Sequence, residues 1–430
     1  MNIEDRKLME LREDKGISKA EFATVIFSNA ATVSKVERGE REYSPEQRIL
    51  AKRHLDIPGM PLTEKDRATA KDRLYKMRDH VRNRDFRKAR EICKKYANLV
   101  NLEPVDIELS MLYRLFEVIL LLFTDKHDDA KERLDYLQGR LDDINALHQY
   151  YFYFNMGVFH IMNGRYVDAL EYCKMALDLS NCHHDFYPDD SEKPRLFAGI
   201  ATCYINLSFP NRAIIYLLKA RGLYTEKKAS RLGLFLDITL AQSYIMIDAL
   251  YEAEGLIDSC LVQADSLEDD YYIGLAMLNF GEYYVKKRDW GNAIECFDQA
   301  AKCCDKATEA YFAAVYRKIR CLIDAREFAQ ARKHIKKAQV IYDTHDVYSI
   351  HIESLVHCLT ISTRKTLPND EAVNYILTVT IPHYEKTCDL FELIDCYKLL
   401  EENFRKTDNS KKALLMKEAI LAIHERVPPQ

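Results

Sequence analysis

Two stretches share one pattern: YFYFNMGVFHIMNGRYVDALEYCKMAL at residues 151–177 and AMLNFGEYYVKKRDWGNAIECFDQA at residues 276–300. In both, an apolar, aromatic-rich helix with a small residue is followed by a turn and a second helix whose apolar face contains alanines. The small residues are Gly157 and Gly281. Small residues let paired helices approach closely, and large aromatics fill the space between one pair and the next. The pattern therefore predicts stacked helix pairs.

The alanine near the start of each second helix recurs along most of the chain. It stands at Ala89, Ala130, Ala169, Ala213, Ala253, Ala293, Ala331, Ala372 and Ala413. The period of about forty residues exceeds the roughly 34 of an ordinary tetratricopeptide repeat (TPR), which these units otherwise resemble. We expect an all-α chain with a right-handed superhelix of about nine TPR-like helix pairs. The last two copies are weaker, which suggests capping pairs or dimerising elements.

A superhelix of helix pairs has a concave surface lined by the first helix of each pair, and such surfaces bind extended peptides or partner helices. A side-chain amide can both donate to and accept from a peptide backbone, so a ladder of Asn and Gln recognises an extended chain. For Asn155 and Asn279, at equivalent positions of two repeats, a second interpretation stays open: they only tie neighbouring helices together. The residues expected on or near the groove are Asn155, Arg195, Asn206, Gln242, Asn279, Glu282, Tyr316 and Arg320.

The first sixty residues predict four short helices. Gly16 supplies the stop of the first helix, Ser18 caps the second, Asn29 caps the third, and Ser44 begins the fourth. Two short helices joined by a tight turn form the helix-turn-helix arrangement, which places its second helix in the major groove of DNA.

The stretch LMELREDKGISKAEFATVIFSNAATVSKVERGEREYSPEQ, residues 8–47, resembles the repressor-type (Cro/CI, or XRE) DNA-binding domain. The resemblance implies hydrogen bonds from Lys19 and Asn29 to phosphates or bases. Alanines on the recognition helix contact only thymine methyl groups. The residues that the resemblance turns towards DNA are Lys19, Asn29, Ala30, Ala31, Thr32 and Lys35.

For three residues of this domain we expect a structural role rather than a contact with DNA. Arg12 and Glu37 occupy positions that form a buried ion pair in similar domains, so we expect them to stabilise the fold rather than read bases. Phe27 stands where the helix-turn-helix turn usually offers a glycine. A bulky residue with positive φ is costly, so we expect another turn geometry, or packing of Phe27 against the following helices.

An XRE-type domain joined to about nine such repeats resembles the RRNPP family of peptide-sensing regulators, in the layout of its NprR-type members. The resemblance implies a cytoplasmic quorum-sensing regulator that forms a homodimer or higher homo-oligomer. Residues 1–60 would bind an inverted-repeat DNA operator, residues 61–68 would be a linker, and residues 69–430 would bind a short signalling peptide and dimerise. Family members use groove asparagines, a role that the resemblance gives here to Asn155, Asn206 and Asn279.

Charge and composition narrow the classes of function. The chain has 62 Lys and Arg against 67 Asp and Glu, a net charge of −5, and 30% charged residues, which favour a folded chain with a solvated surface. No apolar run is long enough to span a bilayer and the N-terminus lacks a secretory pattern, so we expect a cytoplasmic protein without a membrane partner. Residues 61–95 carry 13 basic and 6 acidic side chains. Such a stretch either contacts a polyanion or forms solvated helix faces.

The reactive residue types do not form a familiar site. The 12 cysteines contain no CxxC pair, so reduced, packed thiols are favoured over disulfides, including at Cys303-Cys304. Cys182-His183-His184 and the aspartates that follow lack the spacing of structural zinc motifs, which favours a surface loop. Without a phosphate-binding Gly loop, HExxH or GxSxG, we expect neither an enzyme nor a cofactor.

A rival hypothesis keeps the repeats and needs no DNA. In Rap-like members of the same family, the repeat domain is a protein-interaction module that binds or inhibits a response regulator of a sporulation-type phosphorelay. Under this hypothesis, the helix-turn-helix is auxiliary.

Overall fold

We describe the protein from a computed structural model. It describes residues 3–55, 62, 64–102, 106–124, 126–182, 192–224, 230–304, 309–342, 346–363, 370–387 and 390–425. Every regular element in these ranges is a helix, so the all-α class is confirmed. None of the described helices combines the length and the apolar character that crossing a membrane requires. The chain divides into two compact units, Met1–Asn155 and Met156–Gln430, with the boundary inside one helix.

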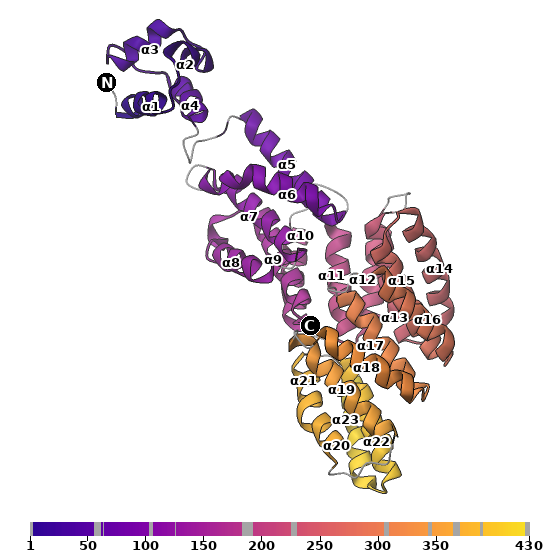
Figure 1. The fold of residues 1–430 in the computed structure, drawn as a ribbon. Helices are drawn as coiled ribbons and strands as arrows, with labels where there is room; N and C mark the ends of the chain where they lie inside the picture. The colour runs from indigo at the N-terminus through magenta and orange to yellow at the C-terminus, as the bar shows by residue number, and fades with distance from the viewer. Residues whose placement is uncertain are drawn as a thin grey trace. The chain divides into compact units, whose positions relative to one another are not determined.

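The first unit begins with four short helices, α1 (Ile3–Asp14), α2 (Lys19–Val25), α3 (Ala30–Glu37) and α4 (Pro45–His54) (Figure 1). Their starts follow the predicted caps, because the side chains of Ser18 and Asn29 accept hydrogen bonds from the backbone N–H groups of Glu21 and Thr32. Ser44 caps α4 in a reciprocal capping box. The core of this domain consists of Leu8, Phe22, Ala23, Ile26, Val33, Val36, Tyr43, Ala51 and Leu55.

Both expectations for Phe27 are wrong. The residue adopts the left-handed conformation at φ 48°, so the turn keeps the geometry that normally favours glycine. Its side chain is 85% exposed, so it does not pack against the following helices. The N–H of Ser28 closes the turn by donating to the carbonyl of Ala23 at 2.8 Å, and this end of α2 is retained despite the unfavourable φ.

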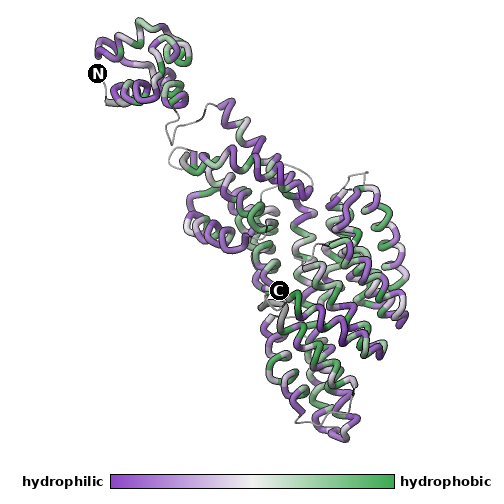
Figure 2. The backbone as a smooth tube through the Cα atoms, in the orientation of Figure 1, coloured by the Kyte–Doolittle hydropathy of each residue, from purple (hydrophilic) through white to green (hydrophobic). Residues whose placement is uncertain are grey.

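The rest of the first unit consists of paired helices. They are α5 (Glu64–Arg82), α6 (Phe86–Tyr96), α7 (Ile107–Leu122), α8 (His127–Gln138) and the first part of α9 (Ala146–Met162), with short 3-10 helices at Ala97–Leu102 and Leu141–Asp143. Helix α5 begins at Glu64, so residues 64–68, which we expected in a linker, are helical. Most side chains of α7 are buried, whereas α8 buries one face and exposes the rest of its side chains. Figure 2 colours the backbone of both helices by hydropathy.

The second unit continues with helix pairs. After α9 come α10 (Tyr166–Cys182), α11 (Glu192–Asn206), α12 (Pro210–Leu223), α13 (Arg231–Met246), α14 (Leu250–Ser266), α15 (Asp270–Lys286), α16 (Trp290–Cys303), α17 (Glu309–Asp324), α18 (Phe328–Tyr342), α19 (Asp346–Thr363), α20 (Glu371–Tyr375), α21 (Ile381–Thr387), α22 (Leu390–Lys406) and α23 (Ser410–His424). A π-helical segment, Ile376–Thr380, joins α20 to α21, so the eighth pair departs from the pattern at its weak copy.

The nine marker alanines are all buried, most of them completely. Each is the fourth residue of the second helix of its pair, except Ala372, which is the second residue of α20. The small residues of the first helices act as predicted: a Cβ atom added at Gly157 would lie 2.6 Å from the Sγ atom of Cys173, and one at Gly281 would overlap the ring of Phe297. The helix-pair prediction is confirmed.

The turn inside a pair has a feature that the sequence pattern did not reveal. Five residues before seven of the nine marker alanines, the chain takes the left-handed conformation, as at Arg288, where φ is 58°. The N–H of the next residue, Asp289, then donates to the carbonyl of Tyr284 at 2.9 Å and closes the end of α15. Only one of these positions is a glycine: they are Arg84, Gly164, Ser208, Asp248, Arg288, Arg326 and Asp408.

Candidate functional site

The predicted recognition helix α3 presents a small polar surface. Asn29, Ala30, Ala31 and Lys35 are exposed, and Thr32 is half-buried. The Oδ1 atom of Asn29 accepts the N–H of Thr32 at 2.8 Å, so its carbonyl group is used as the helix cap and its NH₂ group is the part suited to a phosphate or base.

Lys19 has a structural partner within the domain. Its Nζ atom lies 2.7 Å from Oε2 of Glu37, whose other carboxylate oxygen accepts from Nε of Arg12 at 2.7 Å. Arg12 also donates to the carbonyl of Ile17 at 2.7 Å. The side chains of Arg12 and Glu37 are 6% and 3% exposed, which confirms the expected buried pair. The ammonium group of Lys19 thus joins α2 to α3, and the 45%-exposed side chain remains a predicted DNA contact.

The two equivalent asparagines make the same hydrogen bond in different units. The Nδ2 atom of Asn155 donates to the carbonyl of Leu115, and that of Asn279 donates to the carbonyl of Ile238, each at 2.7 Å. Both side chains are buried and reach back one repeat. Of the two interpretations, the structure supports the one in which these amides tie neighbouring first helices together.

Three other groove candidates lie apart on α11 and α13. Nδ2 of Asn206 donates to the carbonyl of Thr202 within its own helix at 2.9 Å. Arg195 is half-buried near the start of α11, and Gln242 is exposed on α13. These residues stand on first helices, as expected.

The remaining candidates converge. Tyr316 and Arg320 on α17 meet side chains of α22, a helix about 75 residues further along the chain, and Glu282 on α15 pairs with Arg317 of α17. Tyr316 donates its hydroxyl hydrogen to Glu392, and Nη2 of Arg320 donates to Asp395 at 2.8 Å. We call this group the α17–α22 cluster; its members are Glu282, Tyr316, Arg317, Arg320, Glu392 and Asp395.

Sequence reasoning missed half of this cluster. Arg317 lies 3.4 Å from Glu282 and 4.0 Å from Glu392, measured from guanidinium nitrogen to carboxylate oxygen. A signal existed, because residues three apart share a helix face. Arg317 with Arg320 and Glu392 with Asp395 are such pairs, one cationic and one acidic.

The cluster is shielded but not closed to water. Tyr316 and Glu392 are buried, whereas the side chains of Arg317, Arg320 and Asp395 are 35%, 17% and 39% exposed. The carboxylate of Glu282 raises the pKa of Arg317 above its ordinary value. Burial, followed by the charge of Glu392, raises the pKa of Tyr316 well above 10. Both arginines are therefore charged and the tyrosine is neutral at physiological pH.

An aromatic group borders the cluster. His351 on α19 contacts the rings of Phe312, Tyr316 and His383, and its Nδ1 atom lies 3.1 Å from the hydroxyl of Tyr384. Burial, with a smaller contribution from His383, lowers the pKa of His351 to about 4. This imidazole is therefore neutral at pH 7 and adds no charge to the site.

Other features of the described residues offer no second site of this kind. An open cavity of about 490 Å³ lies between α12, α13 and α14. Arg221, Tyr244 and Tyr251 are among the residues that line it, but none of the predicted site residues is. Within the described ranges, no three His, Cys, Asp or Glu side chains gather as metal ligands. The cluster that follows Cys182 lies outside those ranges.

Comparison with known proteins gives curated relatives but no matching family model. The chain is 22% identical to regulatory protein RapD of Bacillus subtilis (strain 168) over 71% of its own length and 85% of the relative's. It is 24% identical to response regulator aspartate phosphatase H of the same organism, over 40% of this chain and 45% of that protein.

Solved structures share the fold over most of the chain. A Rap protein complexed with competence and sporulation factor matches with a TM-score of 0.71 at 17% identity, covering 83% of this chain and 98% of that one. NprR in complex with its cognate peptide NprX matches with a TM-score of 0.65 at 18% identity, covering 85% and 100%. The apo form of NprR from B. thuringiensis gives a TM-score of 0.62 at 19% identity, covering 83% and 99%. The chain therefore shares its all-α fold with the Rap proteins and NprR, and its layout is similar to that of NprR.

Proposed function

We propose that the protein is a cytoplasmic transcriptional regulator whose repeats bind a short signalling peptide and thereby control DNA binding by the helix-turn-helix. One observation supports the proposal: a four-helix domain that resembles the XRE type, with an exposed face on α3, precedes a repeat fold like that of NprR in complex with its cognate peptide NprX. In this proposal residues 1–60 bind DNA, and residues 69–430 bind peptide and form the homodimer.

The α17–α22 cluster suggests the chemistry of the peptide. Three carboxylates, those of Glu282, Glu392 and Asp395, face two guanidinium groups. Two exposed charges lie nearby: Lys398, 3.9 Å from Asp395, and Asp324. They have opposite signs, so the cluster still has one more carboxylate than it has cations. A partly shielded surplus of negative charge favours a cationic group. We therefore propose a peptide with a Lys or Arg side chain, or its free amino terminus, at this position.

Binding at this place would act on the pitch of the repeats. Tyr316–Glu392 and Arg320–Asp395 join helices that belong to different pairs. A cationic peptide group that takes over one of these carboxylates stabilises one arrangement of α17 and α22 over another. The peptide then shifts the population of states by its difference in affinity for them.

The peptide part is tested with a library of five- to ten-residue peptides, followed by titration of the best binder against two variants. Glu392→Gln removes a charge from the cluster, and Glu402→Gln makes the same change on the same helix at an exposed position paired with Lys406. We expect about a tenfold loss of affinity for E392Q and no change for E402Q. Equal affinities in all three proteins would contradict this binding site.

The DNA part is tested by selecting genomic fragments with and without peptide. A twofold-symmetric dimer of such domains predicts half-sites one helical turn apart, or multiples of it. Lys35→Glu on the exposed face of α3 should abolish selection, whereas Lys411→Glu, an exposed lysine of α23, should not. Retention of fragment selection by K35E would remove α3 from the interface.

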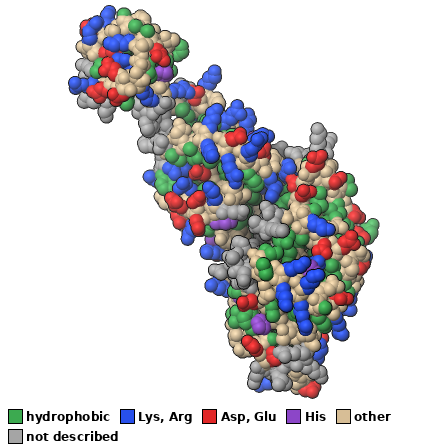
Figure 3. Space-filling model, viewed as in Figure 1, with side chains coloured by type: hydrophobic (Ala, Val, Ile, Leu, Met, Phe, Trp, Pro, Cys, Tyr) green, Lys and Arg blue, Asp and Glu red, His purple; other side chains and the backbone are tan. Residues whose placement is uncertain are grey.

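A second candidate function is the Rap-like interaction with a response regulator. It is favoured by the names of the sequence relatives and by the cationic surface of α5 and α6, where Figure 3 shows Lys and Arg gathered. The exposed cations of α6 are Arg87, Lys88, Arg90, Lys94 and Lys95. If this second function is correct, K35E keeps its activity, and the protein captures or dephosphorylates a phosphorylated response regulator. If the protein is instead a peptide-controlled DNA-binding regulator, K35E loses its activity and no response regulator is captured or dephosphorylated.

A further inference from the structure

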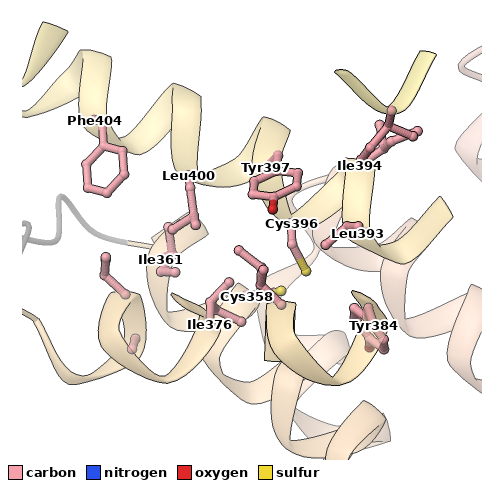
Figure 4. Close-up of a cluster of buried hydrophobic side chains, with 14 of the residues drawn as sticks. Cys358, Ile361, Ile376, Tyr384, Leu393, Ile394, Cys396, Tyr397, Leu400 and Phe404 are labelled. Carbon is pink, nitrogen blue, oxygen red and sulfur yellow. The ribbon is translucent and has the colours of Figure 1, made fainter. Parts of the chain in front are cut away.

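Two cysteines meet beside the α17–α22 cluster. Cys358 on α19 and Cys396 on α22 are each 2% exposed and belong to the core of the last repeats. Figure 4 shows their sulfur atoms next to each other between the two helices, and the two thiols are hydrogen-bonded. The proposed function above uses neither of them.

A guanidinium group lies next to this pair. The Nη1 atom of Arg320 is 4.0 Å from Sγ of Cys358, while its Nη2 atom is held by Asp395. The hydrogen bond from Cys396 and the charge of Arg320 outweigh burial and lower the pKa of Cys358. A thiolate is the reactive form of cysteine, and a neighbouring cation favours it. Arg320 is also partly exposed, so the pair lies one side chain away from water.

The chain contains a matched pair without this cation. Cys173 on α10 and Cys203 on α11 are also buried and hydrogen-bonded to each other. There, a hydrogen bond that the Cys203 thiol donates to Cys173, together with burial, raises the pKa of Cys203 far above its ordinary value. A cation also acts on this second pair, because the charge of Lys174 opposes the rise at Cys203, but its contribution is the smallest. In the first pair the pKa of Cys396 is likewise raised, and the lowered pKa of Cys358, beside the guanidinium of Arg320, sets that pair apart.

We propose that Cys358 and Cys396 form a redox-modified pair that a peroxide oxidises to a disulfide linking α19 to α22. The Cys358 thiolate attacks one peroxide oxygen and breaks the O–O bond, which gives a sulfenic acid and, after proton uptake, water. The Cys396 thiol then attacks the sulfenic sulfur, forms the S–S bond and releases a second water. Two thiols lose two electrons and two protons in all, and hydrogen peroxide is reduced to two waters.

The disulfide would act on the neighbouring site. Cys396 follows Asp395 directly in α22 and is one turn from Glu392. Fixing it to α19 restricts the movement of α22 against α17 that peptide binding requires. This consequence rests on the proposed function, but the disulfide itself does not.

The test treats the full-length protein with hydrogen peroxide, blocks free thiols with N-ethylmaleimide, and quantifies linked peptides by mass spectrometry after digestion. We expect the Cys358–Cys396 link at tenfold or more above the Cys173–Cys203 link. Arg320→Gln should slow its formation about tenfold, which corresponds to one pKa unit of thiolate population. Arg317→Gln, the neighbouring arginine with no contact to Cys358, should not slow it.

Recovery of both Cys358 and Cys396 as free, alkylated thiols in the wild-type protein would overturn the proposal. Equal yields of the two links would overturn the role of Arg320. If the link forms, the affinity for a binding peptide is measured before and after reduction with dithiothreitol. A change that is absent in Cys396→Ser connects the disulfide to the peptide site, whereas an unchanged affinity overturns that connection and leaves the disulfide standing.

Discussion

The ion pairs of the first four helices and those of the α17–α22 cluster are both shielded from water, but they join different kinds of neighbours. Arg12 and Glu37 lie 25 residues apart within one small domain. Arg320 and Asp395 lie 75 residues apart on helices of different repeats. The first pair closes a local fold, whereas the second depends on how repeats stack.

Their charge balance also differs. Glu37 faces Arg12 and Lys19, and Arg12 donates further to Ile17 and Glu13, so this pair is satisfied by the domain itself. The α17–α22 cluster has a surplus carboxylate and four partly exposed members. A satisfied buried pair stabilises the fold that surrounds it, while a surplus charge at a partly open position is available to a ligand.

The comparison predicts the largest loss of stability at Glu37. Glu37→Gln leaves the 6%-exposed Arg12 without its buried charged partner, and removing one member of a buried pair costs about 3–5 kcal/mol. Hydrogen exchange of the backbone amides in α1–α4 should rise accordingly. The exposed Glu13→Gln is the control, with an expected loss below about 0.5 kcal/mol. Similar hydrogen-exchange rates in E37Q and E13Q would show that the Arg12–Glu37 pair does not stabilise its domain in the way that sets it apart from the α17–α22 cluster.

The next effect is on the pH dependence of stability. His351 borders the open cluster, and its pKa of about 4 lies below the ordinary 6.5, so the unfolded chain binds the proton more readily. The stabilisation is complete above pH 6.5 and is lost as the pH falls to 4, by about 2–3 kcal/mol. His351→Gln should flatten this part of the curve in chemical denaturation at pH 7, 5.5 and 4.5.

His148 on α9 provides the same test in the first unit, since burial also lowers its pKa to about 4. His148→Gln should flatten the pH dependence of the first unit's free energy of unfolding and leave that of the second unit unchanged. A variant curve parallel to the wild-type curve at either position would show that the pKa of that histidine does not differ between the folded and unfolded states.

The sequence predicted the features that depend on nearby residues. The caps at Ser18 and Asn29 and the buried marker alanines follow from spacings within one helix or one pair. The Arg12–Glu37 pair was expected only because similar domains have it. A cap or a buried alanine can therefore be predicted wherever its local sequence pattern occurs.

The features that were missed depend on stacking or on strain. Nothing within α22 shows that Glu392 meets Tyr316, because the distance between helices two pairs apart depends on the pitch of the whole stack. Helical spacing alone could have placed Glu392 and Asp395 on one face. The left-handed residues at Phe27 and Arg288 were missed because glycine is the usual signal, and here the closing hydrogen bonds keep the turn without it.

Phe27 gives a smaller effect in the first domain. A non-glycine residue in the left-handed region costs about 1–2 kcal/mol, and glycine gives back part of this through its greater freedom when unfolded. Because the ring is 85% exposed, little packing is lost on its removal. Phe27→Gly should therefore stabilise the domain by about 0.5–1 kcal/mol in thermal unfolding, and Phe27→Ala should not. A destabilised F27G would show that the ring makes contacts that its exposure conceals.

The smallest change in stability is expected at Asp395. Asp395→Asn keeps an oxygen that accepts from Arg320 and removes one charge from a cluster that has a surplus. Since the side chain is 39% exposed and Glu392 remains close to the arginines, the loss should stay below about 1 kcal/mol. Chemical denaturation of D395N beside E37Q measures the difference directly. A loss of 3 kcal/mol or more at Asp395 would make the α17–α22 cluster a structural element like Arg12–Glu37, because a site that must exchange its partners for a peptide cannot depend on one of them for its fold.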